Sequence, residues 1–336
     1  MDLPKLNVSF KNLYDMLMGR MRSKLLLTAI EWKVFNYLIE AKPAIDVARL
    51  IGGEPDNTRF FLDGLAACGL LEKRNGMYKN SYEAEVFLVE GRSTYLGEFF
   101  MHNVHLSEAA HELPRLIKEG PPLQSQDDMG SADRWARAAV YNANYERAGV
   151  AQKLAVIISQ LPEFENFQRM LDLGGGPGII GMAIVDKHPG MRGVVFDQPE
   201  VVKVSQAFIK EYEMENRMEV MGGNYFTDSI GENYDLILAK ATLNFAKDNI
   251  DFIMKKIYDA LNPGGVCIVV TDGLTHEKTK PEIMVLGWLP AAMTGCDMAF
   301  EQGFIADAMI RVGFKSVRGT TVDFPMGPMD MEVARK

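Results

Sequence analysis

The sequence contains little cysteine, and this scarcity excludes two classes of protein. Its three cysteines, Cys68, Cys267 and Cys296, are odd in number and widely spaced among 336 residues. Such spacing provides neither a disulfide framework nor the paired cysteines of a structural zinc site. We therefore expect no bound metal, a reducing compartment and a cytoplasmic protein.

An excess of positive charge and long apolar segments are also absent. The formal net charge is −9, which disfavours nucleic acid as a partner. No segment approaches the roughly twenty consecutive apolar residues of a membrane helix, and the start of the chain, Met1 to Lys5, does not resemble a signal peptide. Because hydrophobic residues make up 47% of the chain, we expect ordinary globular domains with no membrane partner.

The first hundred residues have the pattern of a small helical domain. Apolar residues recur at helical spacing over 25–38, and further helices are predicted for Ile45–Ile51 and Asn57–Cys68. Two short strand-like segments follow, joined by Asn75-Gly76, a dipeptide typical of β-hairpin turns. Three helices followed by a hairpin are typical of a winged helix.

The charges of this segment do not favour DNA binding. Residues 1–90 contain equal numbers of basic and acidic side chains, and Arg59 in the third helix is flanked by Asp56 and Asp63. A DNA-binding helix needs a basic face to contact phosphates. The remaining face is apolar and suits another protein surface, so we expect residues 1–100 to form a dimerisation domain and the protein to be a homodimer.

Strand and helix patterns alternate in the last half of the chain. Residues 101–165 look mostly helical, with a loop at 120–130, and are expected to connect the domains and cover a substrate pocket. From 166 to 336, strands are predicted at 169–173, 193–196, 218–221, 234–239 and 266–271, and helices at 179–187, 199–212, 248–261 and 303–312. This alternation predicts an α/β fold, a doubly wound Rossmann-like sheet with helices on both faces.

A glycine-rich turn follows the first of these strands. Asp172 precedes the glycines of the segment 171–178, and the next strand ends in Asp197. Glycines let the backbone approach a ligand closely, and the helix after them offers free N–H groups. An acid at the end of the second strand can accept both hydroxyls of a ribose, so this arrangement predicts an adenosine-type cofactor.

Two cofactors are compatible with this arrangement. Gly176 to Gly181 formally matches the dinucleotide fingerprint, but two more glycines precede it, so the register is shifted. The other pattern includes Asp172, which would repel a pyrophosphate and attract a cationic amino-acid tail. S-adenosylmethionine (SAM) has such a tail and no phosphate, and we favour it over a nicotinamide.

These segments together resemble the class I SAM-dependent methyltransferases, and more narrowly the small-molecule O-methyltransferases with a winged-helix dimerisation domain. The similar segments are 171–178 for the SAM loop, 196–202 for the ribose-binding strand end, 222–226 for the adenine side and 238–245 for the strand with the catalytic base. The resemblance implies a SAM site that contains Asp172, Gly174, Gly176, Gly178, Asp197, Gln198, Asn224, Tyr225, Phe226 and Lys240.

The chain departs from this family at two positions. Asn224 stands where the family usually has Asp, and an amide can still form hydrogen bonds to the cofactor. Asn244 stands where the family has the His that removes a proton from the substrate, and an amide cannot act as a base. We expect Asn244 to orient the substrate instead, with Tyr141 and Asn144 as further substrate contacts.

Another base could come from the predicted helix 99–118. His102 and His105 are three residues apart and share one helical face. In the related family such a segment can border the substrate pocket, so His105 and then His102 are the candidate bases.

Three functions follow from these observations. The first is methyl transfer to a small molecule, most readily to an acidic phenol or enol hydroxyl, with thiol or carbon acceptors also open because the His is missing. The second is a SAM-binding member of the family that does not methylate and uses SAM in other chemistry. The third is a winged-helix regulator that senses SAM, which the neutral third helix disfavours.

Overall fold

The computed structural model describes residues 3–107, 111–121 and 131–336. The chain divides into two compact units, Met1–Asn103 and Val104–Lys336. Within the described ranges, no helix is both long enough and apolar enough to cross a membrane.

The first unit is helical, with a small antiparallel sheet of strand order β1-β3-β2. Its elements are α1 (Lys11–Glu31), α2 (Val34–Tyr37), β1 (Lys42–Pro43), α3 (Ala44–Ile51), α4 (Pro55–Ala67), β2 (Leu71–Arg74), β3 (Met77–Asn80) and α5 (Tyr82–Phe87). Helix α6 (Gly97–Ser107) follows.

Local sequence explains most of these boundaries. Glu54 caps α4 by accepting hydrogen bonds from Asp56 N and Asn57 N, and Pro55 occupies the first helical position, where its missing N–H costs nothing. Asn75 and Gly76 both have positive φ at the hairpin turn, as a two-residue turn requires. The helix expected over 25–38 is divided in two, because Lys33 adopts left-handed backbone angles.

The second unit contains a seven-stranded sheet of order β6-β5-β4-β7-β8-β10-β9. Its strands are β4 (Arg169–Leu173), β5 (Arg192–Asp197), β6 (Met218–Gly222), β7 (Tyr234–Lys240), β8 (Leu261–Thr271), β9 (Lys315–Phe324) and β10 (Gly327–Arg335). Its helices are α7 (Leu113–Glu119), α8 (Ala132–Tyr145), α9 (Ala151–Ser159), α10 (Ile179–Asp186), α11 (Pro199–Glu211), α12 (Ile250–Ala260), α13 (Glu282–Met293) and α14 (Phe304–Val312).

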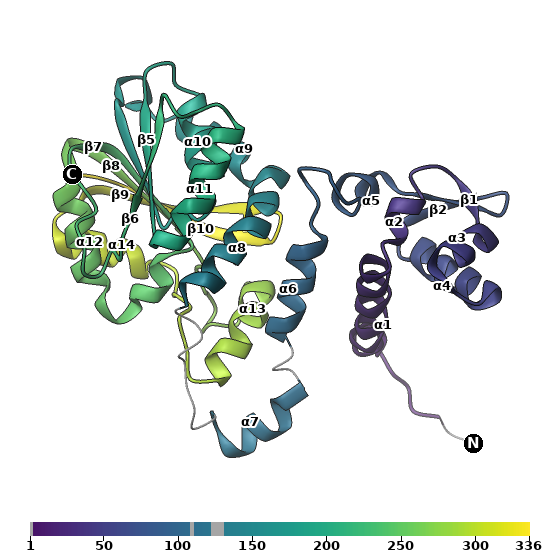
Figure 1. Ribbon diagram of the computed structural model, residues 1–336. Helices are drawn as coiled ribbons and strands as arrows, with labels where there is room; N and C mark the ends of the chain where they lie inside the picture. Colours follow the sequence, from purple (N-terminus) through teal and green to yellow (C-terminus); the bar gives the residue numbers. More distant parts are fainter. Residues whose placement is uncertain (1–2, 108–110, 122–130) are drawn as a thin grey trace. The chain divides into compact units, whose positions relative to one another are not determined.

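Helices cover both faces of this sheet, so the expected α/β fold is confirmed. Helices α9, α10 and α11 lie on one face, and α12 and α14 lie on the other (Figure 1). The central strands are nearly continuous runs of buried apolar residues, as parallel strands covered on both faces require.

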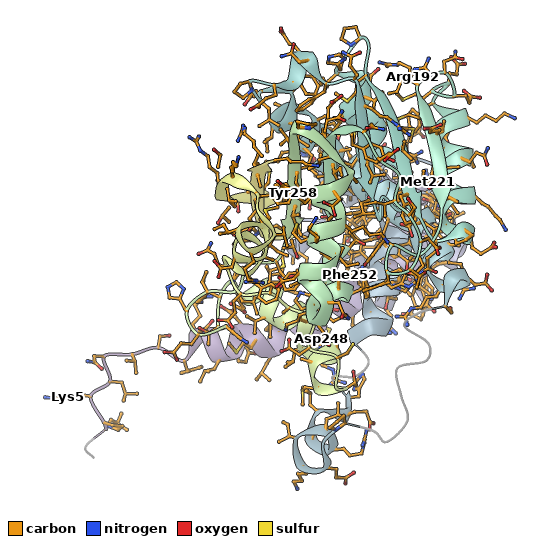
Figure 2. All side chains as sticks on the ribbon, turned by 90° about the vertical axis from the view of Figure 1, so that its left-hand side faces the viewer. Lys5, Arg192, Met221, Asp248, Phe252 and Tyr258 are labelled. Carbon is orange, nitrogen blue, oxygen red and sulfur yellow. The ribbon has the colours of Figure 1, made fainter. Side chains whose placement is uncertain are left out.

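The carboxyl ends of the parallel strands meet at one edge. Figure 2 shows Arg192, at the start of β5, far from Met221, which lies near the end of β6. Phe252 and Tyr258 mark the course of α12 in the same view. Ligands of such sheets bind at the edge where the strands end, so the candidate site lies near Asp197 and Gly222 rather than near Arg192.

Two features of this unit did not follow from the alternating pattern. Strands β9 and β10 pair in antiparallel fashion and extend the sheet beyond β8, and α13 lies in a segment where we predicted no helix. Most of the loop expected at 120–130 lies outside the described residues.

Candidate active site

The glycine loop after β4 requires glycine for two separate reasons. Gly174, Gly176 and Gly178 all have positive φ, between 53° and 77°, a region that other residues avoid. Space is limited as well, because a Cβ on Gly174 would lie 2.2 Å from Thr242 Oγ1. The loop therefore carries no side chain of its own at these three positions.

Neighbouring elements hold this loop in place. Gly174 N donates a hydrogen bond to Phe196 O at 2.7 Å, and Ser205 Oγ on α11 donates one to Gly176 O at 2.6 Å. Gly178 then forms the N-cap of α10. The loop thus ends at a helix N-terminus, whose N–H groups and dipole favour polar ligands.

Asp197 ends β5 and faces the same loop. Its Oδ2 accepts a hydrogen bond from Gly176 N at 2.9 Å and its Oδ1 accepts one from Gln198 N at 2.7 Å. Burial raises the pKa of Asp197, whereas these two N–H groups lower it. Each oxygen keeps a further lone pair, so the carboxylate can accept additional hydroxyl groups.

Three more ionisable groups lie beside the loop, of which Asp172 and Glu146 are buried and Lys240 is partly buried. Asp172 on β4 accepts a hydrogen bond from Gly181 N at 3.1 Å, and burial raises its pKa to about 7. Burial also raises the pKa of Glu146 and lowers that of Lys240, which lies on β7. Lys240 Nζ lies 5.3 Å from the centroid of the Tyr145 ring. Two acids and one base thus share a poorly hydrated region.

The segment expected to bind adenine contains two aromatic rings. Tyr225 and Phe226 have ring centroids 4.8 Å apart, and Tyr225 Oη donates a hydrogen bond to Thr242 O at 3.0 Å. Asn224 Oδ1 accepts a hydrogen bond from Phe226 N at 2.9 Å. In this structure the amide therefore stabilises its own turn.

Asn244 is only 3% exposed, and its amide is engaged in a network. Its Nδ2 donates hydrogen bonds to Asp272 Oδ1 at 2.6 Å and to Met298 O at 3.0 Å, while its Oδ1 accepts one from Thr271 Oγ1 at 3.0 Å. Both amide hydrogens are thus committed to the protein. Only the remaining lone pair of Oδ1 could contact a substrate.

The other expected substrate contacts lie on α8. Asn144 Oδ1 accepts a hydrogen bond from Arg147 Nη1 at 3.2 Å, and the Arg147 guanidinium lies over the Phe208 ring of α11. Asn144 is therefore engaged with the α11 side of its helix. Tyr141 is partly buried, and burial raises its pKa to about 12.

The two candidate bases belong to α6. His102 belongs to the first unit and Asn244 to the second. The side chain of His105 lies outside the described residues. Their catalytic role stays a prediction.

Our reading of the sequence missed several residues of this site. Thr242 and Ser205 lie outside the glycine pattern but contact its loop, and Glu146 interacts with the N–H of Ile180 at the start of α10. Ala241 has a φ of +51°, a strained angle for alanine, and it turns the chain after β7 toward the loop.

Comparison with known proteins agrees with this geometry. Residues 130–290 match a family described as an O-methyltransferase domain, and residues 14–90 match an O-methyltransferase dimerisation domain. The two matches together span most of the chain and correspond to its two units.

Individual relatives of the chain are also methyltransferases. The chain is 26% identical to the tetracenomycin polyketide synthesis 8-O-methyltransferase TcmO of Streptomyces glaucescens, over 94% of this chain and 93% of the relative. It is 25% identical to the N,N-dimethyltransferase OxyT of Streptomyces rimosus, over 77% and 76%.

A solved structure shares the whole fold. Human N-acetylserotonin methyltransferase in complex with SAM superimposes with a TM-score of 0.80 at 22% identity, covering all of this chain and 99% of the other. The domain matches, the relatives and the shared fold lead to one conclusion. The chain belongs to the SAM-dependent O-methyltransferases that carry an N-terminal dimerisation domain.

Proposed function

We infer that the protein transfers a methyl group from SAM to an acidic hydroxyl of a small molecule, of the phenol or enol type. The observation that carries this inference is the glycine loop with Asp172 and Asp197 at the carboxyl ends of β4 and β5. When bound, SAM supplies a methyl group attached to a positively charged sulfur.

The residues at this edge suit SAM. Asp197 has lone pairs for two ribose hydroxyls, and the rings of Tyr225 and Phe226 offer apolar surface for adenine. Gly176 and Gln198 donate main-chain N–H groups to Asp197, and Gly174 and Gly178 complete the same loop with positive φ. Buried acids beside the loop favour a ligand of positive charge there and disfavour the anionic pyrophosphate of a dinucleotide.

The Asn244 network favours an acceptor that needs no base at this position. An amide takes up no proton at neutral pH, and both of its hydrogens are engaged with Asp272 and Met298 O. Holding a nucleophile in line with the methyl group can lower the barrier without proton transfer. An acidic phenol or enol can arrive ionised, and so can a thiol or an enolised carbon.

Related proteins differ in the atom that they methylate, so the methylated atom is determined by experiment. TcmO is named as an O-methyltransferase and OxyT as an N,N-dimethyltransferase, so related chains differ in this respect. Because Asn244 replaces the family's His, a use of SAM without methylation is the alternative function.

The test is incubation of the purified protein with methyl-labelled SAM and a panel of phenols, enols, thiols and amines. Labelled product together with S-adenosylhomocysteine (SAH) is expected, with acidic hydroxyls preferred. A changed acceptor without the label would support the alternative. Failure of the protein to bind SAM or SAH would contradict both.

A further inference from the structure

Glu146 is an unusual residue in the connection between α8 and α9. The helical path is kinked over Glu146–Val150, where Ala148 and Gly149 leave helical backbone angles. The Glu146 side chain nevertheless points inward, with only 8% of the residue exposed. Glutamate is rarely buried to this extent unless it is paired.

The pairing of this carboxyl group is incomplete. The backbone N–H of Ile180, at the start of α10, interacts with it. Within the described part of the chain, its Oε2 has no hydrogen-bond partner. A buried carboxylate oxygen without a partner is costly, and a bound group that pairs with it would offset this cost.

The charged groups around Glu146 indicate what charge a ligand that pairs with it would carry. Asp172 on β4 adds a second acid, while Lys240 on β7 and Arg147 next in the chain add positive charge. Among the described residues, no carboxylate oxygen lies within the 4.0 Å of Lys240 Nζ that would define an ion pair. Two acids and one ammonium group are thus near one another without direct pairing.

An α-amino acid end carries complementary groups, one ammonium and one carboxylate. We propose that Glu146, together with Asp172, binds the ammonium group of the amino-acid end of the cofactor, and that Lys240 faces its carboxylate. This proposal rests on the inferred use of SAM. It adds to the cofactor site a residue, Glu146, that lies outside the glycine loop and outside the ends of β4 and β5. Glu146 is then a residue that positions the cofactor and selects its tail.

The proposal is tested with two ligands that differ in this end. SAH carries the amino-acid end, and 5′-methylthioadenosine lacks it while keeping the adenosine. Calorimetry of Glu146→Gln is expected to show SAH binding weakened about 10- to 100-fold. Binding of 5′-methylthioadenosine is expected to stay unchanged, because that ligand does not reach Glu146.

A matched control is available in Glu332. It is also buried, at 3% exposure, and it also has an Oε2 without a partner, but it lies on β10. Glu332→Gln is expected to bind both ligands like the wild type.

Three outcomes can be distinguished. Wild-type binding of SAH by Glu146→Gln would overturn the proposal. An equal loss for both ligands would also overturn it, because Glu146 would then support the fold of the site. Failure of the wild type to bind either ligand would instead overturn the inferred function.

Discussion

Asp197 organises the glycine loop through its own hydrogen bonds, since it accepts from Gly176 N and Gln198 N. Asp197→Ala removes these bonds and the acceptors proposed for the ribose. Charge-assisted hydrogen bonds contribute about 1.5–3 kcal/mol each, so SAM binding should weaken about 100-fold or more. Calorimetry with SAM and with NADH measures this, and Asp251→Ala, an exposed acid paired with Arg311, is the control. Unchanged SAM binding accompanied by NADH binding would reverse the cofactor assignment.

Asn244 can be tested as a structural bridge or as a substrate contact. Asn244→Ala leaves Asp272, Thr271 and the Met298 carbonyl with fewer partners, so the free energy of unfolding should fall by about 1–3 kcal/mol. Turnover should fall about 10- to 100-fold. Asn244→Asp should be less stable still at neutral pH, because it places a second carboxyl group against Asp272. A variant that keeps its melting temperature and loses only substrate affinity would instead indicate direct substrate contact.

The buried acid Asp172 makes the stability of the ligand-free protein depend on pH. Its pKa rises from 3.8 to about 7 on folding, so between these values the folded protein binds the proton more tightly than the unfolded chain does. The contribution of Asp172 to stability should therefore fall as pH rises from about 4 to about 7, and should change little above that. Asp172→Asn should make this decline shallower. Thermal unfolding of both proteins across this range measures it, and parallel curves would contradict the expectation.

At the scale of the element, α10 packs against β4 through a glycine. A Cβ on Gly181 would lie 2.8 Å from Asp172 Oδ2, so Gly181→Ala should lower stability by about 1–3 kcal/mol and weaken SAM binding. Gly287 in α13 has no atom within 4 Å of such a Cβ, so Gly287→Ala should raise stability by about 0.5–1 kcal/mol. Chemical denaturation of the pair compares them, and equal effects would show that packing at Gly181 is unimportant.

At the scale of the whole molecule, the first unit has apolar surface without a partner in a single chain. Leu13 and Leu17 on α1 are 65% and 67% exposed, and large exposed apolar patches mark interaction sites. The match to a dimerisation domain indicates a second copy as the partner. We expect a homodimer that the pair Leu13→Lys and Leu17→Lys dissociates, as measured by light scattering. Ile310→Lys, on exposed α14 surface, should leave it intact, and a monomeric wild type at micromolar concentration would refute the prediction.

The sequence by itself determined the order of the alternating strands and helices from β4 to β8 and the edge at which the cofactor site lies. Asp172 and Asp197 belong to consecutive parallel strands, and such strands end at the same edge of a sheet. Their meeting at the glycine loop was therefore predictable from spacing alone. The Asn-Gly hairpin and the neutral third helix were also predictable, because local backbone propensity and local charge decide them.

Only the tertiary structure decided the surroundings of Glu146 and Asn244. A helical pattern does not tell whether a particular Glu points inward, since this depends on what packs over the helix. The partners of Asn244 come from β8 and from the segment near Met298, which no local pattern links to it. Strands β9 and β10 were missed because antiparallel pairing at a sheet edge depends on long-range contacts. Burial and hydrogen bonding between distant segments arise when the chain packs, and short-range sequence patterns do not record them.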